Sequence, residues 1–277
     1  MNKNKKRVII LSLFILIILV IWGTNDIVIS NYSIKNKKIP SDFNGYKIVQ
    51  ISDLHNKEFG KNQKRLINKV KKENPDLIVI TGDIVDRRRW GTKYMEEFLK
   101  GIYKIAPIYY VSGNHEMWSF KYNIVKNILK KYNVNVLDDD VKTIKKGNSS
   151  IKISGIIDTG FEDREDYVEE ILKNLKKKIE SDEYSILLSH RPEHIKEYSK
   201  FGYDLVFSGH AHGGQIRVPF IGGLYAPHQG FMPEYTDGVI KMKNTDMVVS
   251  RGLGNSVIPI RIFNRPEITV TTLNNMY

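Results

Sequence analysis

Five short apolar runs along this chain each end in a cluster of Asp, Asn, Glu or His residues. A short apolar run rich in Ile, Val and Tyr, closed by a glycine or a polar turn, is typical of a buried β-strand. The runs span 48–51, 77–80, 108–111, 186–188 and 205–207. The clusters that follow them are Ser52-Asp53-Leu54-His55, Gly82-Asp83, Gly113-Asn114-His115-Glu116, His190 and Gly209-His210-Ala211-His212. The candidate functional residues therefore stand at five strand ends.

Helical patterns separate several of these runs, which favours a sheet that is largely parallel or mixed. We expect helices near 61–73, 93–101, 119–131 and 165–180, strands within 134–157, and late strands over 247–250 and 268–272. In open α/β sheets, ligands collect at the carboxyl ends of the strands, where successive loops converge. The periodicity thus predicts an α/β fold with one site at that edge.

The clusters carry the donor groups of a metal site. They offer carboxylate, imidazole and amide groups, and the chain has no cysteine. This donor set suits borderline-hard divalent ions such as Mn²⁺, Fe²⁺ or Zn²⁺. Asp53 and His55 are two residues apart, so at the end of an extended segment both side chains can leave from one face and point at one ion. Asp83 has two oxygens and can bridge two metals about 3.5 to 4 Å apart, the separation that two-metal hydrolases use.

The order of the clusters resembles the calcineurin-like metallophosphoesterases, whose pattern is D-x-H, G-D-x-x-D, G-N-H-[DE], a lone His and G-H-x-H. The chain shows Asp53-Leu54-His55, Gly82-Asp83-Ile84-Val85-Asp86, Gly113-Asn114-His115-Glu116, His190 and Gly209-His210-Ala211-His212 in that order. The match covers residues 46 to 214, and the following Gly213-Gly214-Gln215-Ile216-Arg217 resembles the membrane-attached phosphodiesterase branch of the family. The resemblance implies a four-layer αββα sandwich of two mixed sheets flanked by helices.

The resemblance also implies a role for each matching residue. The first metal would be held by Asp53, His55, Asp83 and His212, and the second by Asp83, Asn114, His190 and His210. His115 would face the substrate and give a proton to the departing oxygen. Asp86 and Glu116 would orient imidazole N–H groups or the backbone. The implied reaction is in-line attack on phosphorus by a metal-bridging hydroxide, with both ions neutralising the phosphoryl oxygens.

Two further histidines, His194 and His228, have no place in this pattern. A lone histidine is usually a surface residue or a hydrogen-bonded core residue, and we expect that role for both. His194 follows His190 by four positions, so on a helix the pair could share an ion. Pro192 is expected to open that helix, which places His190 before it, at the strand end.

The amino-terminal segment is the second feature that constrains the chain. Residues 3–7 carry four basic side chains, and the fifteen residues 8–22 are apolar except for Ser12. This run gives about 22 Å of helix, short of the roughly 30 Å hydrocarbon core unless Gly23, Thr24 and snorkelling lysines extend it. No small-x-small cleavage site follows, which favours an uncleaved signal anchor over a removed signal peptide. A buried core helix is the alternative, which the apolar character on all sides disfavours.

These features predict three segments. We expect a cytoplasmic basic cap and transmembrane signal anchor over 1–24, a linker or edge strand over 25–45, and the metallophosphoesterase catalytic domain over 46–277. By the positive-inside rule, the cap stays in the cytoplasm and the catalytic domain lies outside, in a single-pass arrangement at the cell membrane. The lysines at 35, 37 and 38 beyond the span weaken this charge asymmetry.

The net charge of the chain limits the kinds of partner that it is expected to bind. The net charge of +12 arises from 43 basic against 31 acidic residues, and a basic domain beside a bilayer is attracted to anionic headgroups. The lysines within 69–72 and 173–178 fall on helical patterns and are expected to be solvated. The arginines at 87–89 follow Asp86 and could reach a substrate phosphate. No nucleic-acid-binding module is recognisable, so we expect no specific nucleic-acid partner, and we expect a monomer.

Together these observations predict a membrane-anchored, dinuclear-metal phosphoesterase, in particular a phosphodiesterase that hydrolyses a phosphodiester or a pyrophosphate. The expected substrate is a phosphorylated lipid, a nucleotide-linked lipid precursor or an envelope polymer. A phosphomonoesterase or phosphoprotein phosphatase uses the same ligands and is the first alternative. A non-catalytic metal-binding scaffold is the second alternative, which the complete set of motifs disfavours.

Overall fold

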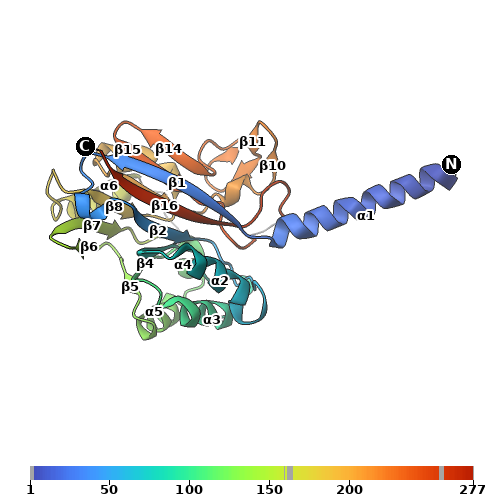
Figure 1. The fold of residues 1–277 in the computed structure, drawn as a ribbon, viewed down its shortest axis with the longest axis horizontal. Helices are drawn as coiled ribbons and strands as arrows, with labels where there is room; N and C mark the ends of the chain where they lie inside the picture. The colour runs from blue at the N-terminus through green and yellow to red at the C-terminus, as the bar shows by residue number, and fades with distance from the viewer. Residues whose placement is uncertain (1–2, 159, 161–164, 256–258, 277) are drawn as a thin grey trace.

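Two six-stranded mixed sheets form the centre of the computed structural model, which describes residues 3–158, 160, 165–255 and 259–276 (Figure 1). In spatial order, the first sheet contains β1 (Val28–Asn36), β16 (Glu267–Asn275), β2 (Tyr46–Ile51), β3 (Leu77–Thr81), β4 (Ile108–Val111) and β5 (Asn135–Val136). The second contains β14 (Gly238–Met242), β15 (Thr245–Val249), β9 (Leu205–Ser208), β8 (Ser185–Leu188), β7 (Ser149–Gly155) and β6 (Val141–Lys146).

Helices cover the outer face of each sheet. The first sheet packs against α2 (Lys64–Glu73), α3 (Lys93–Ile102) and α5 (Tyr122–Lys131), and the second against α6 (Glu165–Lys176) and α7 (Ile195–Lys200). The helices are amphipathic, as α2 shows by burying Leu66, Ile67 and Val70 while its lysines lie on the other side. The molecule is therefore a four-layer αββα sandwich, which confirms the expected fold.

The core lies in three apolar layers because successive residues of a strand point to opposite faces. In β2, Ile48 enters the layer between the two sheets, whereas Val49 and Ile51 enter the layer beneath the helices. All three side chains are fully buried. Each such burial contributes about 1.5 to 3 kcal/mol to folding. These layers hold the strand ends, and with them the polar clusters, in fixed positions.

The segment 25–45 corrects the expectation of a linker, because most of it belongs to the fold. Strand β1 pairs in parallel with β16, in register from Val28 opposite Glu267 to Asn36 opposite Asn275. Ile34 of this strand is buried between the sheets. An edge strand forms here because β16 would otherwise leave a row of unpaired N–H and C=O groups at the sheet edge. The edge-strand alternative is thus the one that the structure adopts.

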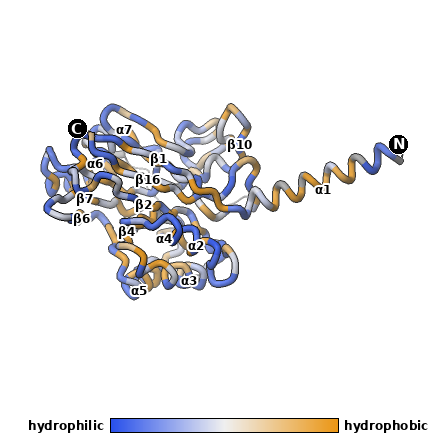
Figure 2. The backbone as a smooth tube through the Cα atoms, viewed as in Figure 1, coloured by the Kyte–Doolittle hydropathy of each residue, from blue (hydrophilic) through white to orange (hydrophobic). Residues whose placement is uncertain are grey.

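The amino-terminal helix α1 (Lys3–Asn25) projects away from the sheets (Figure 1). Figure 2 shows its apolar character along most of its length. Residues 4–25 give about 33 Å of helix, which by length and composition is enough to cross a membrane. Most of the apolar side chains that the structure describes in α1 are exposed, among them Ile10 at 66% and Phe14 at 59%. The buried core helix that was the alternative is therefore excluded.

The directions of the strands place the strand ends near α1. β1 leaves α1 and runs parallel to β16, and β16 runs antiparallel to β2, which is followed by the parallel β3 and β4. The carboxyl ends of β2, β3 and β4 therefore lie at the end of the sheet from which α1 departs, opposite the carboxyl terminus (Figure 1). The polar clusters that follow these strands stand at that same end.

Candidate metal centre

The loops after β2, β3, β4, β8 and β9 bring all eight predicted site residues into one buried cluster. None of them is more than 5% exposed. They are Asp53, His55, Asp83, Asn114, His115, His190, His210 and His212. Asn114 and His115 begin the short helix α4 (Asn114–Trp118), and His212 begins the 3₁₀ turn η4 (His212–Gly214). The other five lie on the turns between a strand and the next element. Residues from both sheets thus meet at one edge of the sandwich.

One half of the cluster contains Asp53, His55 and His212. Nε2 of His55 lies 3.1 Å from Nε2 of His212, and Oδ1 of Asp53 lies 3.8 Å and 3.4 Å from these two nitrogens. Burial lowers the pKa of His55 to about 3 and holds the pKa of His212 well below its usual value. Both imidazoles are therefore neutral and can each offer a lone pair to a cation between them.

The other half contains Asp83, Asn114, His190 and His210. Nε2 of His190 lies 3.1 Å from Nδ1 of His210, 3.2 Å from Oδ1 of Asn114 and 3.3 Å from Oδ2 of Asp83. Nδ1 of His190 donates a hydrogen bond of 2.7 Å to the Thr81 carbonyl, which turns its Nε2 toward the other three groups. Burial holds the pKa of His210 well below its usual value, so this imidazole is neutral as well.

The donor set fits two divalent cations. In the first half, two neutral imidazole nitrogens face one another beside a carboxylate oxygen, so a cation there would satisfy lone pairs that otherwise oppose each other. In the second half, a cation would take the place of the proton on His190. Asp83 belongs to both halves, because its Oδ2 lies within 3.5 Å of Nε2 of His55 and within 3.3 Å of Nε2 of His190. Nitrogen and oxygen donors without thiolate suit Mn²⁺, Fe²⁺ or Zn²⁺.

The backbone that carries these donors is left-handed at five positions, contrary to one expectation. β2 ends at Ile51, and Asp53 and His55 follow it with φ of 52° and 46°. The expectation that the side chains of Asp53 and His55 leave one face of an extended segment is therefore wrong. A left-handed turn brings these two side chains together instead. Asp83, His210 and His212 also have positive φ, of 52°, 65° and 48°. Such conformations cost about 1 to 3 kcal/mol each and gather at functional sites.

Two glycines of the motifs allow the carboxylates to approach the backbone. A Cβ at Gly113 would lie 2.8 Å from Cγ of Asp83, and a Cβ at Gly209 would lie 2.5 Å from Oδ2 of Asp53. Real Cβ atoms do not approach other atoms so closely. The glycines are therefore required by the packing of Asp83 and Asp53 rather than by the ligands themselves.

His115 lies beside the first half of the cluster. Its ring centroid is 4.5 Å from that of His55, and its Nδ1 lies 3.5 Å from Oδ1 of Asp86. Burial lowers the pKa of His115, but the carboxylates of Asp83 and Asp86 outweigh burial and raise the pKa above its usual value. A raised pKa favours the protonated imidazole, which is the form that can give a proton to a leaving oxygen.

Glu116 and Asp86, the two other carboxylates of the motifs, form hydrogen bonds that fix the loops after β3 and β4. Glu116 accepts hydrogen bonds from the backbone N–H groups of Asp83, Val85 and Gly113 at 2.8, 3.1 and 2.7 Å. It thereby ties the loop after β3 to the loop after β4. Asp86 accepts from the side chain of Arg89 at 2.8 Å, so this arginine is turned back toward its own loop.

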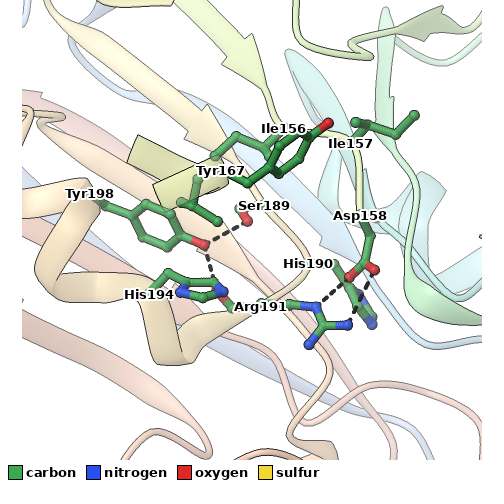
Figure 3. A pocket seen from close by; sticks show the side chains of 10 residues that line it. Ile156, Ile157, Asp158, Tyr167, Ser189, His190, Arg191, His194 and Tyr198 are labelled. Atoms are coloured by element: carbon green, nitrogen blue, oxygen red, sulfur yellow. Dashed lines mark hydrogen bonds and ion pairs between the residues drawn. The ribbon is translucent and has the colours of Figure 1, made fainter. Parts of the chain in front are cut away.

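The structure adds His228, Arg191 and Asp158 to the surroundings of the site. Nδ1 of His228 lies 2.9 Å from Nε2 of His210, and the Arg191 guanidinium lies 3.3 Å from Nδ1 of His228. Figure 3 shows Arg191 facing Asp158, with 2.8 Å between Nε and Oδ2, beside a cavity of about 20 Å³ that His190 also lines. His228 stands on the hairpin of β12 (Tyr225–Ala226) and β13 (Gly230–Phe231), so no local sequence pattern connects it with His210.

His194 takes the ordinary role expected of it. It is 7% exposed, with its ring 6.3 Å from that of Tyr198. It ends a short 3₁₀ turn, η3 (Pro192–His194), which Pro192 opens and which leaves His190 at the strand end as expected.

Comparison with known proteins agrees with this geometry. The profile of the family described as calcineurin-like phosphoesterase matches residues 46–214. The chain belongs to this family. It is therefore a metal-dependent phosphoesterase, a hydrolase, and calcineurin-like phosphoesterases use two divalent metals, for which the Asp and His clusters offer suitable ligands.

Relatives span most of the chain. The uncharacterized metallophosphoesterase YkuE of Bacillus subtilis is 32% identical over 252 residues, which cover 89% of this chain and 85% of that protein. A transmembrane protein with a metallophosphoesterase domain from Danio rerio is 25% identical over 288 residues, covering 95% of this chain and 62% of that protein. Among solved structures, the phosphopantetheinyl hydrolase of Mycobacterium tuberculosis has a TM-score of 0.49 at 12% identity, covering 75% of this chain and 89% of that one.

Proposed function

We propose that the chain is a membrane-anchored phosphodiesterase that hydrolyses a phosphodiester or pyrophosphate at a dinuclear metal site. The observation that carries the proposal is the position of Asp83, whose Oδ2 faces a histidine of each half of the cluster. A carboxylate shared in this way would hold two cations close enough together to bind one phosphoryl group. Asp53, His55 and His212 face one another, and so do Asp83, His190 and His210, which supports two neighbouring cation positions.

Different residues of the chain would bind the two ions, orient the metal ligands and donate a proton. When bound, two divalent ions neutralise the phosphoryl oxygens and lower the pKa of a water that attacks phosphorus. Asp53, Asp83 and the neutral imidazoles would hold these ions, and His190 is oriented by its hydrogen bond to the Thr81 carbonyl. His115, beside Asp86, would give its proton to the departing oxygen. The protonated form that this step needs is the one that the raised pKa favours.

The proposal places the substrate at a membrane. Helix α1 is long and apolar enough to span a bilayer, and the Danio rerio relative is described as a transmembrane protein. The basic residues before the apolar run favour a cytoplasmic amino end and a catalytic domain outside. Because the metal centre lies at the α1 end of the sandwich, we infer a phosphorylated lipid, a nucleotide-linked lipid precursor or an envelope polymer as the substrate class.

Turnover of paired chromogenic substrates tests the preference for diesters. The full chain in detergent, supplied with Mn²⁺, is expected to hydrolyse bis(p-nitrophenyl) phosphate with a higher kcat/KM than p-nitrophenyl phosphate. A faster monoester reaction would favour the phosphomonoesterase or phosphoprotein phosphatase alternative. No turnover of either substrate at full metal load would favour the non-catalytic scaffold. The Asp83→Asn variant serves as the control for contaminating phosphatases.

Protease digestion of intact cells tests the orientation. A catalytic domain outside the membrane is expected to be cleaved by added protease, whereas a cytoplasmic marker enzyme stays intact. A domain that resists digestion until the cells are lysed would contradict the orientation.

A further inference from the structure

Large apolar side chains are exposed on two neighbouring hairpins near the metal centre. The first hairpin joins β10 (Arg217–Val218) to β11 (Gly222–Gly223), and its tip leaves Phe220 fully exposed and Ile221 60% exposed. The hairpin of β12 and β13 exposes Phe231 at 83%. Tyr225 at 46%, Met232 at 59% and Phe263 at 72% complete the set. Contiguous exposed apolar side chains of this size are typical of a surface that contacts a protein or a membrane.

Phe263 connects the first hairpin with the apolar surface of α1. The backbone N–H of Arg217 donates to the Ile262 carbonyl at 3.0 Å, which ties the first hairpin to the segment 259–265. That segment reaches α1, because the backbone N–H of Arg261 donates to Oγ1 of Thr24 at 3.1 Å. Phe263 lines both the hollow beneath the Phe220 tip and a cavity of about 380 Å³ formed with Val20 and Trp22 of α1. Figure 1 shows β10 and β11 at the end of the body from which α1 leaves.

Trp22 and Arg265, where α1 meets the rest of the fold, are residue types that are common at membrane surfaces. The guanidinium of Arg265 lies over the ring of Trp22, 4.5 Å from its centroid. Trp at the end of a span and Arg with an apolar stem are enriched at the level of the lipid headgroups. Trp22 and Phe263 line the same cavity, so Phe263 lies close to this end of α1.

We propose that the exposed residues of the two hairpins, together with Phe263, insert into the headgroup layer of an anionic bilayer as a second membrane contact beside α1. This proposal rests on the proposed membrane anchoring by α1. The set is called here the interfacial loops and consists of 220, 221, 225, 231, 232 and 263. A bilayer is favoured over a protein partner because Phe263 lines one cavity with Val20 and Trp22 of α1. The net charge of +12, less the four basic residues of the cap, also leaves +8 on the rest of the chain, which favours anionic headgroups.

Two contacts with one bilayer would fix the rotation of the catalytic body about α1. The β12–β13 hairpin carries Phe231 on its exposed side and His228 beside His210. Insertion of Phe231 would therefore bring the edge of the metal centre to the bilayer surface. A phosphate in the headgroup layer, rather than one in bulk solution, would then be the group presented to the site.

Site-directed spin labelling of the full chain tests this contact, because the chain has no cysteine to interfere. Single labels are placed through Phe220→Cys and Phe231→Cys in the interfacial loops. Ile17→Cys in α1 is the control for anchoring, and Asn244→Cys in the β14–β15 turn, at the end of the sandwich opposite α1, is the control for water exposure. The labelled chains are reconstituted into vesicles of phosphatidylglycerol and phosphatidylcholine, and unchanged thermal unfolding shows that each is folded.

Collision rates with oxygen, which concentrates in lipid, and with a nickel chelate, which stays in water, give the position of each label. Labels at 17, 220 and 231 are expected to collide more often with oxygen than with the nickel chelate. The label at 244 is expected to collide more often with the nickel chelate. Nickel access at 220 and 231 with oxygen preference at 17 would overturn the second contact but keep the anchor. Nickel access at 17 would overturn the anchor and the second contact together. Labels at 220 and 231 shielded from both reagents would indicate a second copy of the chain and would also overturn the proposal.

Discussion

Oδ2 of Asp83 lies 3.3 Å from Nε2 of His190, and the same oxygen lies 3.5 Å from Nε2 of His55. One carboxylate oxygen thus faces an imidazole of each half of the cluster. Burial opposes ionisation of Asp83, but the neighbouring His190 and His115 outweigh burial and lower its pKa well below the usual value. Asp83 is therefore the negative charge around which both halves are arranged.

Replacing Asp83 by Asn is expected to abolish turnover and to remove bound metal from both halves, because the shared charge is lost while the shape is kept. Metal content by mass spectrometry and turnover of the aryl diester measure the two effects. Asp246→Asn, which removes a carboxylate at the opposite end of the fold, is the matched control and should change neither. Activity retained at full metal load would refute the shared role of Asp83.

Replacing His115 by Gln or Ala is expected to lower kcat by about 10²- to 10⁴-fold, the usual range for loss of a general acid, and to leave metal content nearly unchanged. The loss should be largest for diesters with a poor leaving group, which need the proton most. A series of aryl diesters with leaving groups of increasing pKa measures this dependence. Metal loss equal to that of Asp83→Asn would instead make His115 a metal ligand.

Replacing His228 by Ala is expected to weaken metal binding about 10- to 100-fold, the usual range for loss of a group that orients a ligand. Nε2 of His210 faces Nδ1 of His228 at 2.9 Å, so this contact directs Nδ1 of His210 toward the second cation position. Competition with a chelator gives the affinity. His194→Ala, a change at a buried histidine of the same region, is the control. Equal affinities of the two variants and the parent would remove His228 from the site.

Metal affinity is expected to rise with pH. Burial lowers the pKa of His190, but the carboxylates of Asp83 and Asp53 outweigh burial and raise the pKa to about 10. His190 is therefore protonated in the metal-free protein below that pH, and a cation must displace this proton. The displacement predicts about a tenfold gain in apparent affinity per pH unit below pH 10 for one released proton.

Calorimetric titration at pH 8 in buffers with different enthalpies of ionisation counts the protons that metal binding releases. The parent is expected to release more protons than the His190→Asn variant. A titration with no proton release, together with an affinity that does not change with pH, would contradict the charged state of His190.

The parts of the fold that follow local patterns could be predicted from the sequence. The helical period of Leu66, Ile67 and Val70 predicts α2, and the run at 77–80 that ends before Asp83 predicts a buried strand. The position of the polar clusters at one edge follows from those strands, because parallel strands end at the same edge. The two-sheet architecture came from the family resemblance, since periodicity alone does not distinguish one sheet from two.

The parts that depend on long-range pairing could not be predicted in this way. Val28 pairs with Glu267 across almost the whole chain, and no local pattern at 25–45 indicates that partner. His228 reaches His210 only because its hairpin folds over the site. The left-handed turns at Asp53 and His55 depend on the packing around them, whereas a D-x-H pattern alone is also compatible with an extended segment. Tertiary contacts determine each of these features.

Side chains from five loops are proposed to hold a pair of cations, and anomalous scattering from crystals of the protein loaded with Mn²⁺ would locate those cations. Two peaks about 3.5 to 4 Å apart are expected. One should lie among Asp53, His55 and His212, the other among Asn114, His190 and His210, and both should contact Asp83. A single peak, peaks at other residues, or no peak from protein saturated with Mn²⁺ would rule out a dinuclear site at these residues.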